Sequence, residues 1–201
     1  MSKNELQQEY NPMTVRRIEV ICSLVEPEKN VICLGCRNND VITKVLMERT
    51  TKLQTLDCAN NADIVADLDF GIPLEAESFE YVVAGEIIEH LYDTNHIFSE
   101  MHRVLKSGGF LVLSVPNISR LRNRVKMLFG GVPIACAKNE HIRDFNLSLI
   151  LQHLKQNNFK VVSLKSDGVW VRNKKILPSC LCRTSWGEHI IIKAAKEEIN
   201  E

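Results

Sequence analysis

The chain has 201 residues and a mass of 22.9 kDa, which suits one domain of ordinary size. Hydrophobic residues make up 45% and charged residues 25%, which is too apolar for a disordered chain. Basic and acidic residues number 25 each, so the formal net charge is zero and no overall field attracts nucleic acid. No apolar run reaches the roughly 18 residues that span a bilayer. We therefore expect a globular protein with no nucleic-acid partner and no membrane span.

The seven cysteines are odd in number, and several lie in or beside apolar runs. The first residues carry no signal-peptide pattern. Together these features favour buried free thiols in a reducing cytoplasm. Cys180 and Cys182 are close in sequence, but their spacing is not that of a standard zinc knuckle, and we expect no metal site. The cysteines are Cys22, Cys33, Cys36, Cys58, Cys136, Cys180 and Cys182.

The amino-terminal half alternates short apolar runs with helical patterns. The predicted elements are a helix over 14–25, a strand over 31–34, a helix over 40–49 and strands over 53–56, 64–66 and 81–84. Only six residues, Cys58 to Asp63, separate the second and third strands, whereas parallel neighbours usually need a dozen or more. Either this connection is an extended loop, or the strand boundaries are shifted by a few residues.

The carboxyl-terminal half continues the alternation. A strongly amphipathic helix is predicted over 94–105, with Gly108 and Gly109 as its stop signal. The later elements are strands over 110–115, 160–164 and 189–194, helices over 119–129 and 147–157, and a long excursion over 167–188.

The strands are apolar at successive positions, which indicates that both faces of the sheet are covered. We therefore predict an α/β fold with a doubly wound, mostly parallel sheet of the seven-stranded type and helices on both faces. Residues 29–201 form this domain, and residues 1–28 are expected to contribute a helical segment that packs on its core.

In a doubly wound sheet, ligands bind beyond the carboxyl ends of the strands, where the strand order reverses. The turn that begins at Gly35 leads into a helix and offers backbone N–H groups to a carboxylate. Asp57 ends the second strand, where an acid can accept both hydroxyls of a ribose. Asp67 and Glu86 follow the third and fourth strands. The pattern predicts a ligand site at this edge.

From about Asn30 to Asn117 the chain resembles the class I S-adenosylmethionine-dependent methyltransferases. The ordered series of motifs is specific, although each motif alone is weak. The matching segments are Ile32-Cys33-Leu34-Gly35-Cys36, Asp57, Asp63 to Asp69, Ser78 to Val83, Glu86-Ile87-Ile88-Glu89-His90, His102 to Gly109 and Ser114-Val115-Pro116-Asn117.

The resemblance implies a Rossmann-like methyltransferase that uses S-adenosylmethionine. His90 and His141 are the implied candidates for the general base, with Glu86 or Glu89 orienting them. The residues implied to bind the cofactor are Gly35, Cys36, Arg37, Asp57, Asp67, Leu68 and Glu86.

Two further segments, Leu121 to Gly130 and His141 to Phe145, resemble the subgroup associated with glycan and lipopolysaccharide synthesis. This resemblance implies methyl transfer to an oxygen or nitrogen of a small-molecule or glycan-linked acceptor.

The first motif departs from the family pattern. Cys33 stands where the family has an acid, and Arg37 and Asn39 stand where it has glycines. Losing a charge-assisted hydrogen bond costs about 1.5–3 kcal/mol, or roughly ten- to hundredfold in affinity. The alternative interpretation is a degenerate, non-catalytic relative that acts in partner binding or regulation.

Overall fold

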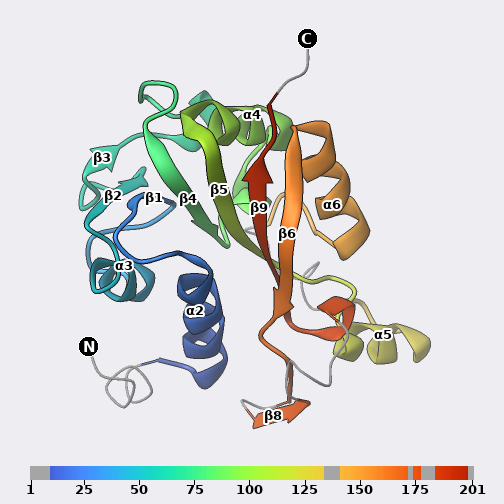
Figure 1. Ribbon diagram of the computed structural model, residues 1–201. Helices are drawn as coiled ribbons and strands as arrows, with labels where there is room; N and C mark the ends of the chain where they lie inside the picture. Colours follow the sequence, from blue (N-terminus) through green and yellow to red (C-terminus); the bar gives the residue numbers. More distant parts are fainter. Residues whose placement is uncertain (1–9, 134–140, 172–173, 178–183, 199–201) are drawn as a thin grey trace.

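The computed structural model describes residues 10–133, 141–171, 174–177 and 184–198. Its centre is a seven-stranded sheet in the order β3-β2-β1-β4-β5-β9-β6, flanked by helices (Figure 1). All neighbouring strands from β3 to β5 are parallel, and β9 runs antiparallel to both of its neighbours, β5 and β6. The predicted fold class, a mostly parallel seven-stranded sheet, is confirmed.

The predicted helices and strands occur in the predicted order, and the structure adds η1, η2 and η4 and, within the predicted excursion, the strand pair β7–β8. The elements are α2 (Pro12–Leu24), β1 (Asn30–Leu34), α3 (Val41–Met47), β2 (Lys52–Asp57), β3 (Ile64–Val65), η1 (Leu68–Phe70), β4 (Phe79–Gly85), η2 (Ile88–His90), α4 (Thr94–Val104), β5 (Leu105–Pro116), α5 (Leu121–Leu128), α6 (Leu147–Gln156), β6 (Phe159–Ser166), β7 (Val169–Val171), β8 (Lys174–Leu177), η4 (Thr184–Trp186) and β9 (His189–Lys196). None of the helices in the described residues is long and apolar enough to cross a membrane.

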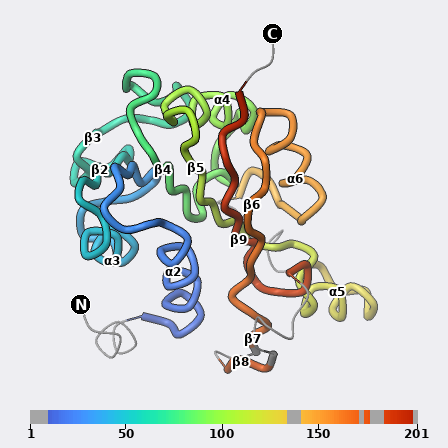
Figure 2. Tube along the Cα trace, viewed as in Figure 1, coloured from blue at the N-terminus to red at the C-terminus, as the bar shows by residue number. Residues whose placement is uncertain are grey.

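Both faces of the sheet are buried, as the continuous apolar strands predict. Ile32 and Leu34 of β1 face one core, which includes side chains of α4 and α6. Val31 and Cys33, at the alternate positions, face the other core, which is formed with α2 and α3. Figure 2 shows α3 at the left, α2 between it and the middle of the molecule, and α6 alongside β6 at the right.

The parallel register brings several strand ends to one edge of the sheet. Leu34 of β1 is paired with Leu56 of β2 and with Ala84 of β4. Pro116 at the end of β5 is paired with His189, the first residue of β9. This edge lies where the strand order reverses between β1 and β4, the usual ligand position in such sheets.

The predicted stop signal of α4 is wrong, although the predicted range of the helix, 94–105, agrees with the structure. Gly108 and Gly109 do not cap α4, because Leu105 already has an extended backbone and begins β5. The two glycines lie within β5, next to an irregularity in its register with β4. A Cβ at Gly109 would lie 2.8 Å from the carbonyl oxygen of Lys106, so the tight bend itself requires glycine.

The short connection between β2 and β3 is an extended loop, which was one of the two possibilities that the sequence left open. Asp63 closes it, because its carboxylate accepts hydrogen bonds from the Thr55 N–H at 3.0 Å and from Asn38 at 3.1 Å. β3 is only two residues long and needs little space to pair with β2.

Candidate active site

Four residues predicted from the sequence lie around the carboxyl edge of the sheet. Gly35 follows β1, Asp57 ends β2, Asp67 lies two residues beyond β3 and Glu86 follows β4. Because these strands are parallel neighbours, their ends meet at the same edge, which we call the rim.

The turn after β1 requires glycine at its first position. Gly35 has φ +64°, and its N–H donates to the carbonyl oxygen of Leu56 at 2.8 Å. A Cβ at this position would lie 2.7 Å from the side chain of Ile87. Glycine therefore allows the backbone of the first motif to approach the segment that follows β4.

Arg37 does not fill the turn. Its guanidinium pairs with Asp40 at 3.3 Å, and half of its side chain is exposed. Its backbone N–H donates to the same carboxylate at 2.7 Å. The side chain is therefore held against the residue that precedes α3.

Cys33 and Cys36 form a disulfide, so the expectation of free thiols is wrong for this pair. The two Cα atoms are 5.6 Å apart across the turn, a distance within the usual range for a disulfide. Both residues are buried. Among the described cysteines, Cys22 and Cys58 are free thiols, whereas Cys136, Cys180 and Cys182 lie outside the described residues.

The two aspartates predicted to contact the nucleoside differ in environment. Asp57 is half-buried and accepts a hydrogen bond from the Ala59 N–H at 2.8 Å. Asp67 is exposed and caps η1 through the Asp69 N–H at 3.0 Å. Leu68 is buried in the core that includes side chains of α4, so it anchors this part of the rim to the core.

Glu86 lies at the centre of a network that extends across the rim. It has φ +58°, an uncommon backbone conformation for a residue with a side chain and one that is often found at functional sites. Its carboxylate is 2.8 Å from Arg17 of α2 and 3.4 Å from the hydroxyl of Ser114. Nε2 of His189 is 3.5 Å from the same carboxylate.

Sequence reasoning missed Arg17, His189 and Asp167. Asp167 is completely buried and lies 2.7 Å from Nδ1 of His189. It follows β6, so the strand-end rule that selected Asp57 could have selected it too. His189 begins the antiparallel strand, whose amino end lies at the rim, and a rule based on carboxyl ends overlooks it.

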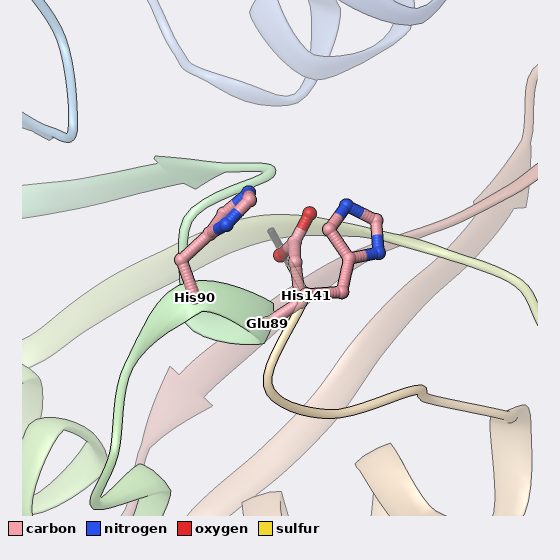
Figure 3. Close-up of side chains that lie close together, drawn as sticks. All are labelled: Glu89, His90 and His141. Atoms are coloured by element: carbon pink, nitrogen blue, oxygen red, sulfur yellow. The ribbon is translucent and has the colours of Figure 1, made fainter. Parts of the chain in front are cut away.

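A second group combines two side chains that follow β4 with one from the segment before α6. Glu89, His90 and His141 can each offer one ligand atom, and these three atoms lie within 4.8 Å of one another. Figure 3 shows the two imidazoles and the Glu89 carboxylate gathered above η2. The sequence predicted both histidines as candidates, and the structure brings them together, with ring centroids 4.9 Å apart.

A cavity of about 200 Å³ lies elsewhere, lined by residues that include Lys29, Glu80 and Gly109. These residues lie at the amino ends of β1 and β4 and near the start of β5. The cavity is therefore at the opposite edge from the rim, and we do not assign a cofactor to it.

Comparison with known proteins agrees with this geometry. A family model described as "Methyltransferase domain" matches residues 35–113, from the turn after β1 into β5. A curated protein of Mycolicibacterium smegmatis, described as "Probable S-adenosylmethionine-dependent methyltransferase", is 30% identical over 90 residues. This region covers 45% of the chain and 32% of that protein, so the chain spans about a third of its length.

Solved structures show the same fold. A protein of Thermotoga maritima, described as a SAM-dependent methyltransferase and possible histamine N-methyltransferase, has a TM-score of 0.70 at 15% identity, covering 96% of each chain. An S-adenosylmethionine-dependent methyltransferase of Mesorhizobium loti has a TM-score of 0.61 at 14% identity, covering 90% of this chain and 98% of the other. The predicted Rossmann-like methyltransferase fold is confirmed. The predictions of a methyltransferase domain and of S-adenosylmethionine as its cofactor are supported by the family match and the curated relative.

Proposed function

We propose that this protein is an S-adenosylmethionine-dependent methyltransferase whose cofactor site is the rim. The observation that carries the proposal is the meeting of Gly35, Asp57 and Glu86 at the point where the strand order reverses. Gly35 is the first residue of the matched methyltransferase domain, and Asp57 and Glu86 lie at the ends of β2 and β4 within it.

The residues present fit such a cofactor. We assign the turn of Gly35, Cys36 and Arg37 to the cofactor's amino-acid part. The N–H groups of Gly35 and Cys36 already donate to the carbonyl oxygen of Leu56, so the group that would meet the cofactor's carboxylate is Arg37, in exchange for its partner Asp40. Asp57 is placed to accept the ribose hydroxyls, and Asp67 and Leu68 are assigned to the adenine side. Glu86 is assigned to the ammonium group, which would take the place of its present partner, Arg17.

When bound, the cofactor supplies an activated methyl group, so the protein's main task is to align an acceptor atom with it. We assign His90 and His141 to the acceptor, because both follow β4 or pack against the segment that does. The proposed acceptor is an oxygen or nitrogen of a small-molecule or glycan-linked compound. Its support is the resemblance of Leu121 to Gly130 and of His141 to Phe145 to the glycan-associated subgroup.

Isothermal titration calorimetry with S-adenosylmethionine tests this proposal. The wild-type chain should bind one equivalent. Asp57→Asn should weaken binding about ten- to hundredfold, because a neutral amide replaces a charged acceptor of two hydroxyl hydrogen bonds. Glu75→Gln, a change at an exposed acid away from the rim, is the matched control and should bind as the wild type does.

The alternative, a fold kept for partner binding, is favoured by the Cys33–Cys36 disulfide within the first motif and by the pairing of Glu86 with Arg17. At a cofactor concentration of about 1 mM, even a weak site with a Kd of about 1 mM would be half filled. If the protein then shows neither binding heat nor a rise in its unfolding temperature, the alternative is supported and the proposed enzyme is refuted.

A further inference from the structure

Beyond the rim, the most concentrated group of metal-ligand side chains in the described residues is Glu89, His90 and His141. Their candidate ligand atoms lie within 4.8 Å of one another. Glu89 and His90 come from η2, and His141 comes from the segment that leads to α6. A cluster built from two distant parts of the sequence depends on the fold and not on a local run of charges.

The burial of the cluster distinguishes it from an exposed acidic patch. Glu89 is only 1% exposed, and both histidines are half-buried. Placing a carboxylate away from water is unfavourable by several kcal/mol unless positive charge and hydrogen bonds offset it. A divalent cation would add positive charge beside this carboxylate, and neutral imidazoles can bind such a cation without adding charge of their own.

Backbone contacts hold the two segments in register. The N–H groups of Ile142 and Arg143 donate to the carbonyl oxygen of Glu89 at 3.0 and 3.2 Å. Arg143 also donates through its side chain to the hydroxyl of Thr94 at 3.0 Å and to the carbonyl oxygen of Tyr92. His141 is therefore tied, one residue away, to the backbone that carries the other two side chains.

We propose that Glu89, His90 and His141 bind a divalent transition-metal cation of the Zn²⁺ type. Two imidazoles and one carboxylate form a ligand set that such ions favour, and three protein ligands leave a coordination position open. Binding requires side-chain rotations that bring these ligand atoms, now within 4.8 Å of one another, to about 2 Å from a common ion. Figure 3 shows the carboxylate drawn between the two rings, the arrangement that this binding requires.

The open position gives the cation a role at the acceptor, and this part of the inference rests on the proposed methyl transfer. An acceptor that presents a hydroxyl together with a neighbouring oxygen fills this position and a fifth one, because a Zn²⁺ ion with three protein ligands can expand to five-coordinate. Coordination lowers the pKa of the bound hydroxyl, whose proton leaves to water. The inferred acceptor class is therefore a compound with adjacent oxygen ligands.

Titration of the full chain, stripped with a chelator, with Co²⁺ tests the cation site. Visible absorption separates imidazole and carboxylate ligation from thiolate ligation, which matters in a chain with seven cysteines. Calorimetry with Zn²⁺ gives the stoichiometry and affinity. The wild type should bind one equivalent with nitrogen and oxygen ligation.

Two variants and a control assign the ligands. His141→Ala and Glu89→Gln should each weaken Zn²⁺ binding by at least about tenfold, because losing even an outer-shell partner typically has an effect of this size. His96→Ala, which removes an exposed histidine of α4, should bind as the wild type does. Circular dichroism shows whether each variant is folded. If Glu89→Gln fails to fold because Glu89 is buried, the result for His141→Ala decides the test.

Thiolate absorption, or equal affinity in His141→Ala and the wild type, overturns the cation site. The acceptor role is tested with acetohydroxamate, a chelator with two oxygens, which should change the Co²⁺ spectrum of the wild type. No change overturns the inferred acceptor class. S-adenosylmethionine binding is measured separately, so loss of the cation site leaves the proposed function standing, and loss of cofactor binding does not alter the cation result.

Discussion

Nδ1 of His189 lies 2.7 Å from one carboxylate oxygen of Asp167, and the other oxygen accepts the backbone N–H of His189 at 3.0 Å. Asp167 is fully buried and His189 is nearly so. This pairing fixes the imidazole so that Nε2 faces Glu86 at the rim. The buried aspartate therefore controls how a rim histidine is presented.

Asp167→Asn should lower the free energy of unfolding by roughly 1–3 kcal/mol, because a neutral amide cannot satisfy both donors of His189 with charged hydrogen bonds. Urea denaturation measures the change. The exposed Glu75→Gln variant should stay within about 0.5 kcal/mol of the wild type. If both variants are equally stable, the pairing contributes nothing.

Gly35→Ala should destabilise the fold and weaken S-adenosylmethionine binding. A positive φ costs a residue with a Cβ about 1–2 kcal/mol, and here the Cβ would also meet Ile87 at 2.7 Å. Gly108→Ala is a matched control, since Gly108 has φ +73° and no atom within 4 Å of the added Cβ. Denaturation should show the greater loss for Gly35→Ala, with part of the difference recovered by adding Ile87→Ala. Equal losses would mean that backbone strain alone matters at this turn.

Without reductant, peptide mapping by mass spectrometry should find Cys33 and Cys36 linked to each other. Iodoacetamide should label the exposed Cys58 in the native protein. Cys22 should resist labelling, because burial raises the pKa of its thiol to about 12 and keeps it protonated. Labelling of Cys33 before reduction would show that the disulfide is absent.

The stability of the protein should fall as the pH drops below about 6.5, in part because of His153. Burial, assisted by the charge of Arg143, lowers the pKa of His153 from its ordinary value of 6.5. The unfolded chain therefore takes up a proton before the folded protein does, and the free energy of unfolding decreases until the pH lies below the folded pKa.

His153→Gln should make this fall shallower between about pH 7 and pH 5, the range in which imidazoles titrate. Urea midpoints across that range provide the measurement, and the exposed His96→Gln variant serves as the control. A fall as steep as that of the wild type would exclude His153 as a contributor.

The architecture could be predicted from the sequence because its strands are apolar at successive positions. In the run from Val31 to Leu34, alternate residues face the core beside α2 and the core beside α4. Only a sheet that is covered by helices on both faces can bury such a run. The predicted helix over 94–105 matches α4, but the role of Gly108 and Gly109 could not be predicted, because they resemble a helix stop and instead serve a bend within β5.

The residues of the rim could be predicted only where they follow the parallel strands in sequence. Asp57 and Glu86 were found by that rule. Arg17 reaches the rim from a preceding helix, and His189 begins an antiparallel strand, so neither position carries a local signal. The Cys33–Cys36 bond also escaped prediction, because the apolar surroundings of both cysteines favoured buried thiols.

The most direct test of the central claim is a crystal structure of the protein with S-adenosylhomocysteine. We predict that the nucleoside binds at the rim, with its ribose on Asp57, its amino-acid part at the turn of Gly35 and Arg17 or Glu86 in contact with that part. A rim that stays closed by the pairing of Arg17 with Glu86, or a nucleoside bound at another edge of the sheet, would contradict it.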